Sequence, residues 1–151
     1  MHIRPVEISQ PDGICCSYGL VADQHDDKLP PVLVVSFSGT YPPGSLGNAH
    51  GRFMAHATVH GLAAFNPWCV LLDLRELRYE WGNTLLAVFE QITQYSSDAS
   101  FPVVVVTSGK CRDAFLSLVR PAGAPAPDWH FEDLDAALEC AVQKANEWID
   151  A

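Results

Sequence analysis

Three short and almost uninterrupted apolar runs constrain the fold of this chain most. They occupy residues 32–37, 68–74 and 103–106. Because they are rich in valine and leucine and lack strict alternation with polar residues, each is expected to be a strand buried on both faces. Segments with helical periodicity separate and follow these runs. This order predicts an α/β fold, with a mixed, mostly parallel β-sheet flanked by helices.

The N-terminal part of the chain is expected to add a β-hairpin to this sheet. Residues 6–8 and 14–21 are short β-prone runs, and the sequence Pro11-Asp12-Gly13 between them is typical of a tight turn. A polar loop over residues 22–31 then leads to the first buried strand. The hairpin makes the sheet mixed, because its strands are antiparallel.

Helical periodicity and breaking residues place the remaining elements. Helices are expected at residues 45–65, around 85–92, at 110–119 and at 134–149, with a last short strand at 129–131. The last helix has the clearest amphipathic pattern. Its apolar stripe consists of Leu134, Ala137, Leu138, Ala141, Val142, Ala145, Trp148 and Ile149.

Length, charge and composition limit the classes to which the protein can belong. The 151 residues are expected to form one domain, 1–151, because 48% of them are hydrophobic and only 18% are charged. Nine basic residues against 18 acidic ones give a net charge of −9. Nucleic acids and anionic membrane surfaces bind clusters of Lys and Arg, and this sequence has no such cluster. We therefore expect neither nucleic acid nor a membrane as the main partner.

The N-terminal sequence and the cysteines indicate a cytoplasmic location. Arg4 and Pro5 stand where a signal peptide would need an apolar run, and no later run approaches the length of a membrane span. The five cysteines show no C-x-x-C spacing, so we expect buried free thiols. Cys111, at an expected helix start, is the one cysteine whose reactivity deserves a test.

The sequence carries no motif of a common cofactor site or serine hydrolase. No G-x-G-x-x-G follows a strand, and no G-x-S-x-G is present. Val104 stands where a phosphate-binding loop ending in Gly109-Lys110 would need its first glycine. We therefore expect no bound cofactor.

His56 and His60 lie four residues apart in the first expected helix, a spacing that could place two metal ligands on one face. No glutamate follows His56, and no third ligand stands at motif distance, so we expect no metal site. With Phe53, the two histidines are expected to point away from the core. These three residues form a possible secondary contact surface.

Residues 70–79, with the sequence Val-Leu-Leu-Asp-Leu-Arg-Glu-Leu-Arg-Tyr, precede a turn and a helix that opens with Thr84-Leu85-Leu86. Together with residues 34–39 and 131–138, they resemble in order the STAS domain, the family of bacterial anti-sigma factor antagonists. The resemblance covers roughly residues 32 to 145. It implies a STAS-like sheet and a regulatory module that binds other proteins without catalysis.

The chain departs from that family at the loop before the helix. Where the family has Asp-Ser-Ser-Gly, this chain has Trp81-Gly82-Asn83-Thr84, so only Thr84 could accept phosphate there. The resemblance therefore implies a divergent member without the regulatory serine, whose partner is a protein or a second copy. The predicted contact surface is Tyr79, Glu80, Trp81, Gly82, Asn83 and Thr84. Trp81 is its expected anchor, and the alternative is that its indole packs on its own domain.

Two other interpretations compete with this one. Residues 69–74 and 102–108 also resemble the response-regulator receiver domain, with Asp73 at a strand end as phosphoacceptor and Thr107 as switch hydroxyl. The segment 39–67 has room for about one helix, however, where a receiver needs two helices and a strand. A third interpretation is an enzyme of the ClpP and crotonase type, in which Gly82 and Asn83 supply oxyanion donors. Strand order, and any hydroxyl or thiol near His50, His56, His60 or His130, would separate the three.

Overall fold

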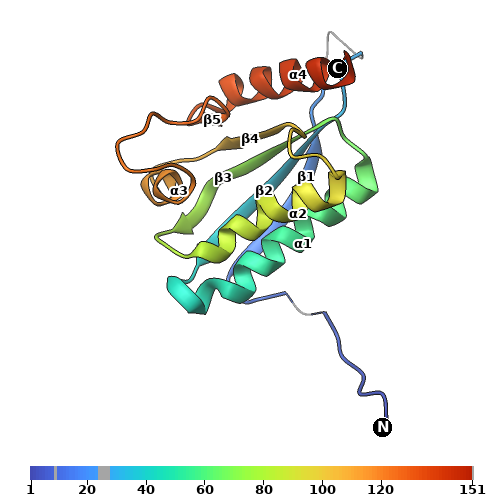
Figure 1. The fold of residues 1–151 in the computed structure, drawn as a ribbon, viewed down its shortest axis with the longest axis vertical. Coiled ribbons are helices and arrows are strands. Elements are labelled where there is room, and N and C mark those ends of the chain that lie inside the picture. The colour runs from blue at the N-terminus through green and yellow to red at the C-terminus, as the bar shows by residue number, and fades with distance from the viewer. Residues whose placement is uncertain (9, 24–27, 151) are drawn as a thin grey trace.

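The computed structural model describes residues 1–8, 10–23 and 28–150 of the chain. Within these residues, five strands and four α-helices follow one another with two short 3₁₀ helices (Figure 1). Their order is β1 (Ile14–Leu20), β2 (Val32–Tyr41), η1 (Gly44–Gly47), α1 (Asn48–Phe65), β3 (Cys69–Tyr79), η2 (Asn83–Leu86), α2 (Ala87–Ser96), β4 (Val103–Val106), α3 (Arg112–Val119), β5 (His130–Phe131) and α4 (Leu134–Asp150).

The five strands form one sheet in the order β1-β2-β3-β4-β5. β1 pairs with β2 antiparallel, and the other three pairs are parallel. The predicted fold class, a mixed and mostly parallel sheet flanked by helices with an antiparallel hairpin at its N-terminal end, is confirmed.

The hairpin differs from the predicted one in its strands. β1 pairs with β2, from Ile14 opposite Gly39 to Leu20 opposite Leu33. Residues 6–8 form no strand, so the prediction of a strand there is wrong. Their backbone has no described partner, whereas β1 hydrogen-bonds to the buried strand β2. Part of the predicted loop 22–31, residues 24–27, lies outside the described residues.

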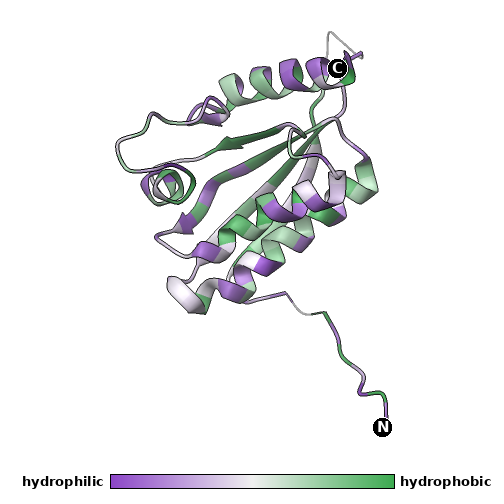
Figure 2. Ribbon diagram, in the orientation of Figure 1, coloured by the Kyte–Doolittle hydropathy of each residue, from purple (hydrophilic) through white to green (hydrophobic). Residues whose placement is uncertain are grey.

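Helices cover both faces of the sheet with different kinds of side chain. On one face, α1, α2 and α3 bury large residues against the strands, such as Met54, Ile92 and Phe115. On the other face, α4 contacts β2, β3 and β4 through Ala137, Ala141 and Ala145. Figure 2 shows the hydrophobic strands at the centre and hydrophilic positions along the outer sides of the helices. The small alanines let α4 lie close to the sheet, but they cover only a narrow strip of it.

The two central strands run further than their apolar runs suggest. β2 continues past residue 37 to Tyr41, and β3 continues past residue 74 to Tyr79. A register shift between Ser36 and Ser38 accompanies this extension. The expectation that Asp73 ends a strand is therefore wrong, because β3 alternates buried and exposed residues beyond it and still pairs with β2.

Within the part of the chain that the structure describes, no helix combines the length and the hydrophobicity that crossing a bilayer requires.

Candidate functional site

β2 and β3 end side by side in a pair of buried tyrosines. Tyr41 is the register partner of Tyr79, and the two rings meet edge to face with centroids 5.0 Å apart. Both side chains are almost fully buried. We call this region the aromatic corner: Tyr41 and Tyr79 with the loops that follow them, residues 42–47 and 80–86. It lies at the carboxyl edge of the parallel strands, where α/β sheets present their functional loops.

Hydrogen bonds connect the two loops of the aromatic corner and fix their positions. The Tyr79 hydroxyl donates to the Gly82 carbonyl at 2.7 Å, and the Gly44 amide donates to the Trp81 carbonyl at 3.2 Å. The Thr84 hydroxyl donates to Asn48 Oδ1 at the start of α1, at 2.6 Å. Burial raises the pKa of Tyr79 to about 12, so its hydroxyl stays a neutral donor at any physiological pH.

Glycines allow the loops to approach the tyrosine rings closely. A Cβ on Gly82, whose φ is +144°, would lie 2.9 Å from Tyr41 Cε1. A Cβ on Gly47 would clash with the Pro42 carbonyl oxygen and with the Tyr41 ring. The sequence pattern marks these glycines only as weak points of a helix or loop. Their packing role becomes visible when β2 and β3 end together.

The six residues of the predicted contact surface fall into two groups. Glu80, Trp81 and Asn83 are exposed and Thr84 is half-buried, whereas Tyr79 and Gly82 are buried beneath the loop. Tyr79 and Gly82 therefore position the surface and do not form it.

Trp81 combines the two alternatives that its sequence position left open. Its indole rests on Gly44, where a Cβ would lie 2.5 Å from Trp81 Cη2. The side chain is nevertheless 63% exposed, so the ring is supported from below and open above. Leu46, on the neighbouring loop, is 77% exposed and was missed by sequence reasoning. Its only sequence signal is an apolar residue inside a loop of prolines and glycines.

Asp73 is placed inside β3, on the side of the sheet that α4 leaves partly open. Its Oδ1 accepts hydrogen bonds from Arg75 N at 3.1 Å and Arg75 Nε at 2.9 Å, and its Oδ2 pairs with Arg75 Nη2 at 2.9 Å. The hydrogen bonds that the Arg75 guanidinium donates to Asp73 raise the pKa of Arg75. A receiver has the strand order 2-1-3-4-5, whereas this sheet runs β1-β2-β3-β4-β5. Neither the topology nor this occupied carboxylate resembles a phosphoacceptor site.

Two of the four histidines named for an enzyme site have a close polar partner. Thr107 Oγ1 lies 2.7 Å from His130 Nε2, and His50 Nε2 lies 2.8 Å from the Asp12 carbonyl oxygen. Thr107 is fully buried, so its hydroxyl cannot reach a substrate. The pair instead joins the ends of β4 and β5, because Thr107 also donates its amide to Phe131.

The possible secondary surface on α1 keeps only its histidines. His56 and His60 are exposed, as expected. Phe53 is half-buried and packs edge to face on Phe37, with ring centroids 6.4 Å apart. The expectation that Phe53 points away from the core is wrong, because the apolar face of α1 is wider than its helical wheel suggests.

The cysteines divide by burial. Cys111 is buried, and its Sγ donates to the Leu74 carbonyl at 3.2 Å. Burial raises the pKa of the Cys111 thiol, which disfavours the reactive thiolate. Cys69 is also buried, whereas Cys15 is exposed and Cys16 and Cys140 are half-buried. The prediction of buried thiols therefore holds for two of the five.

Among the comparisons with known proteins, the one with solved structures finds matches. No family model matches the sequence, and no curated protein matches it. Among solved structures, the chain is similar to an anti-sigma factor antagonist from Mycobacterium paratuberculosis. The match covers 89% of this chain and 98% of that one, with 18% sequence identity and a TM-score of 0.48.

Proposed function

We propose that this chain is a single-domain, cytoplasmic protein-interaction module that acts by binding and not by catalysis. Its contact surface is the exposed part of the aromatic corner, centred on Trp81 with Glu80, Asn83 and Thr84 on the same loop, and it includes the exposed Leu46 on the loop that Gly44 joins to Trp81. The partner is a protein that offers an apolar pocket for the indole. The free cysteines fit a reducing compartment such as the cytoplasm.

The observation that carries this proposal is the exposure of Trp81 on a loop that is held in place. An exposed tryptophan on a mobile loop would lose conformational entropy when it binds. Here the Trp81 backbone is hydrogen-bonded to Gly44, and the ring already rests on that glycine. Large aromatic side chains presented in this way are typical anchors of protein interfaces.

The proposed contact does not depend on phosphorylation. Thr84 and Asp73 are the candidate phosphorylation sites of the sequence, and both are engaged. The Thr84 hydroxyl donates to Asn48, and Asp73 is paired with Arg75. Modification of Thr84 would remove the hydrogen bond between η2 and α1 and would so act on the same surface.

The test is a comparison of captured partners between the wild-type chain and Trp81→Ala in lysate of the source cell. We expect the variant to lose at least one partner that the wild type binds directly when both are purified, while its thermal unfolding stays nearly unchanged. Tyr95→Ala is the matched control, because Tyr95 is also an exposed aromatic residue but lies on α2. It should keep the partner.

An unchanged set of direct partners for Trp81→Ala would refute the proposal. So would a large loss of stability without any loss of binding, since the indole would then be a structural residue. Thr107→Val tests the enzyme alternative, because among the described residues it removes the hydroxyl that lies within hydrogen-bond distance of the His130 ring. Under the proposal it leaves partner binding intact.

A further inference from the structure

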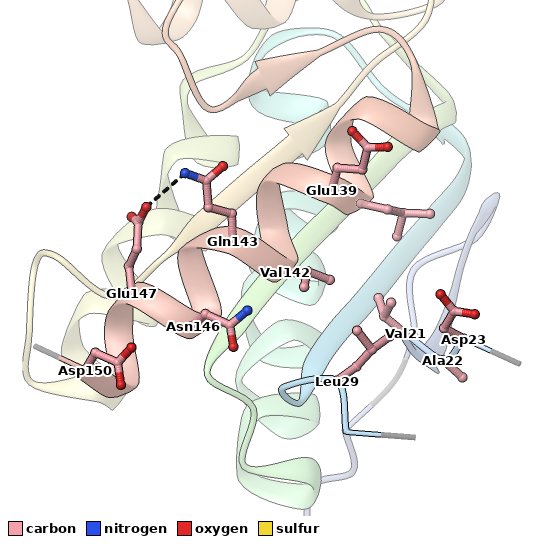
Figure 3. Close-up of a pocket in the computed structure, with 11 residues that line it drawn as sticks. Val21, Ala22, Asp23, Leu29, Glu139, Val142, Gln143, Asn146, Glu147 and Asp150 are labelled. Carbon is pink, nitrogen blue, oxygen red and sulfur yellow. Dashed lines mark hydrogen bonds between the residues drawn. The ribbon is translucent and has the colours of Figure 1, made fainter. Parts of the chain in front are cut away.

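An apolar groove runs along one side of α4. It forms because some apolar side chains of this helix lie outside its contact with the sheet. The alanines of α4 contact the strands, whereas Leu138 and Val142 lie beside them and are only half-buried. Val21 and Leu29, from the segment between β1 and β2, form the other wall. Figure 3 shows Val21, Leu29 and Val142 facing one another across the groove. The groove has a volume of about 570 Å³.

The rim of this groove is acidic. Glu139, Glu147 and Asp150 on α4 line it, and its described lining residues include no lysine, arginine or histidine (Figure 3). The Gln143 side-chain amide donates a hydrogen bond to the Glu147 carboxylate at 3.0 Å. Because the amide is uncharged, the carboxylate keeps its negative charge. A segment that fits this groove must therefore offer apolar side chains to the floor and a positive charge to the rim.

The N-terminal segment, residues 1–8, offers apolar side chains and the positive charge of Arg4, together with the negative charge of Glu7. The side chains of Ile3 and Val6 are 93% and 76% exposed. His2 precedes Ile3 in the sequence, and Arg4 lies between Ile3 and Val6. An extended peptide places alternate side chains on opposite sides, so Ile3 and Arg4 can face different walls of a groove.

The segment and the groove lie at opposite ends of the molecule. Figure 1 shows the N-terminus leaving the body at the end away from α4. The two features therefore meet most directly between two copies, as a head-to-tail contact in which the segment of one copy meets the groove of another.

We propose that residues 1–8 of one copy bind in the α4 groove of a second copy. Ile3 lies on the apolar floor, and Arg4, on the opposite side of the extended segment, faces the acidic rim formed by Glu139, Glu147 and Asp150. The contact is independent of the proposed function, since Trp81 does not line the groove.

The test measures self-association of the full chain by sedimentation over a wide range of concentration. Wild type is expected to associate, and Ile3→Asp in the segment or Val142→Asp in the groove should each raise the apparent dissociation constant at least tenfold. Glu147→Lys is a second groove variant at an exposed position, where folding is not at risk. Tyr95→Asp is the control, because it adds the same charge on α2 and should associate like wild type.

Mixing the variants gives the sharpest outcome. An equimolar mixture of Ile3→Asp and Val142→Asp contains one intact groove and one intact segment, so it should form a discrete heterodimer although neither variant associates alone. A wild-type chain that stays monomeric near millimolar concentration overturns the proposal. Association that survives in both Ile3→Asp and Glu147→Lys, or a mixture that stays monomeric, does the same.

Discussion

The carboxyl edge of the sheet has two halves that are held together by different forces. At the aromatic corner, Tyr41 and Tyr79 pack against glycines, and the hydrogen bonds join uncharged groups. At the other half, where β4 and β5 end, His130 bonds to Thr107 and lies over Phe115, with ring centroids 5.8 Å apart. We call the second half the His130 end.

Charged groups surround the His130 end. Arg112 pairs with Glu132 at 3.0 Å, and Lys110 pairs with Glu76 at 2.8 Å, all with exposed side chains. Close packing therefore stabilises the aromatic corner, and charge interactions contribute to the stability of the His130 end. The aromatic corner should respond strongly to added volume and little to pH, and the His130 end should respond to pH.

The largest expected effect comes from adding one methyl group to the aromatic corner. Gly47→Ala should lower the free energy of unfolding by about 1–3 kcal/mol, because its Cβ would meet the Pro42 carbonyl and the buried Tyr41 ring. Denaturant unfolding measures the change. Gly109→Ala is the matched control, since no atom lies within 4 Å of its added Cβ. Equal stability of the two variants would mean that the corner is loosely packed.

Much of this fold could be predicted from the sequence, because apolar runs report burial directly. The runs at 32–37, 68–74 and 103–106 became β2, β3 and β4, and the long α1 and α4 helices begin and end near their predicted residues. The ends of β2 and β3 were missed because residues past 37 and 74 mix polar with apolar side chains. Their strand structure depends on pairing between β2 and β3, which periodicity within one segment does not report.

The candidate site could be predicted only in part, for a similar reason. The loop containing Trp81 was predicted as a contact surface from the resemblance to the STAS domain and from a large aromatic residue in a loop. Leu46 was missed because its loop is joined to the Trp81 loop by a long-range contact. That contact is the hydrogen bond between Gly44 and Trp81, which are 37 residues apart along the chain. The burial of Tyr79 follows from its pairing with Tyr41 across two strands.

Removing the hydroxyl group of each tyrosine in the aromatic corner should change the free energy of unfolding by a smaller amount, and by a different amount for each tyrosine. Tyr79→Phe removes the hydroxyl that donates to the Gly82 carbonyl, and it should cost about 1 kcal/mol of stability. Within the part of the chain that the structure describes, the buried Tyr41 hydroxyl makes no well-formed hydrogen bond, although Thr84 and the Leu85 backbone lie near enough to oppose the burial that raises its pKa. Tyr41→Phe should therefore cost less stability than Tyr79→Phe. Denaturant unfolding of both variants checks the difference. A cost for Tyr41→Phe as large as that of Tyr79→Phe would show that the Tyr41 hydroxyl does have a partner.

The smallest expected effect is a pH dependence at the His130 end. Burial lowers the pKa of His130 below its usual 6.5, and Arg112 and Arg120 act in the same direction while Glu132 opposes them. Between the lowered pKa and 6.5, the unfolded chain binds more protons than the folded one. Stability therefore falls as the pH drops from 7 through 6.5, and it levels off below the lowered pKa.

The thermal unfolding midpoint measured between pH 7.5 and pH 5 checks this last prediction, as a difference between variants. His130→Gln keeps an amide near the position of Nε2 and cannot titrate, so its midpoint should fall less on acidification than that of wild type. His56→Gln is the control for the loss of an exposed histidine. If His130→Gln and wild type lose stability in parallel, the pH response arises elsewhere, and the two halves of the edge do not differ in the way that their contacts indicate.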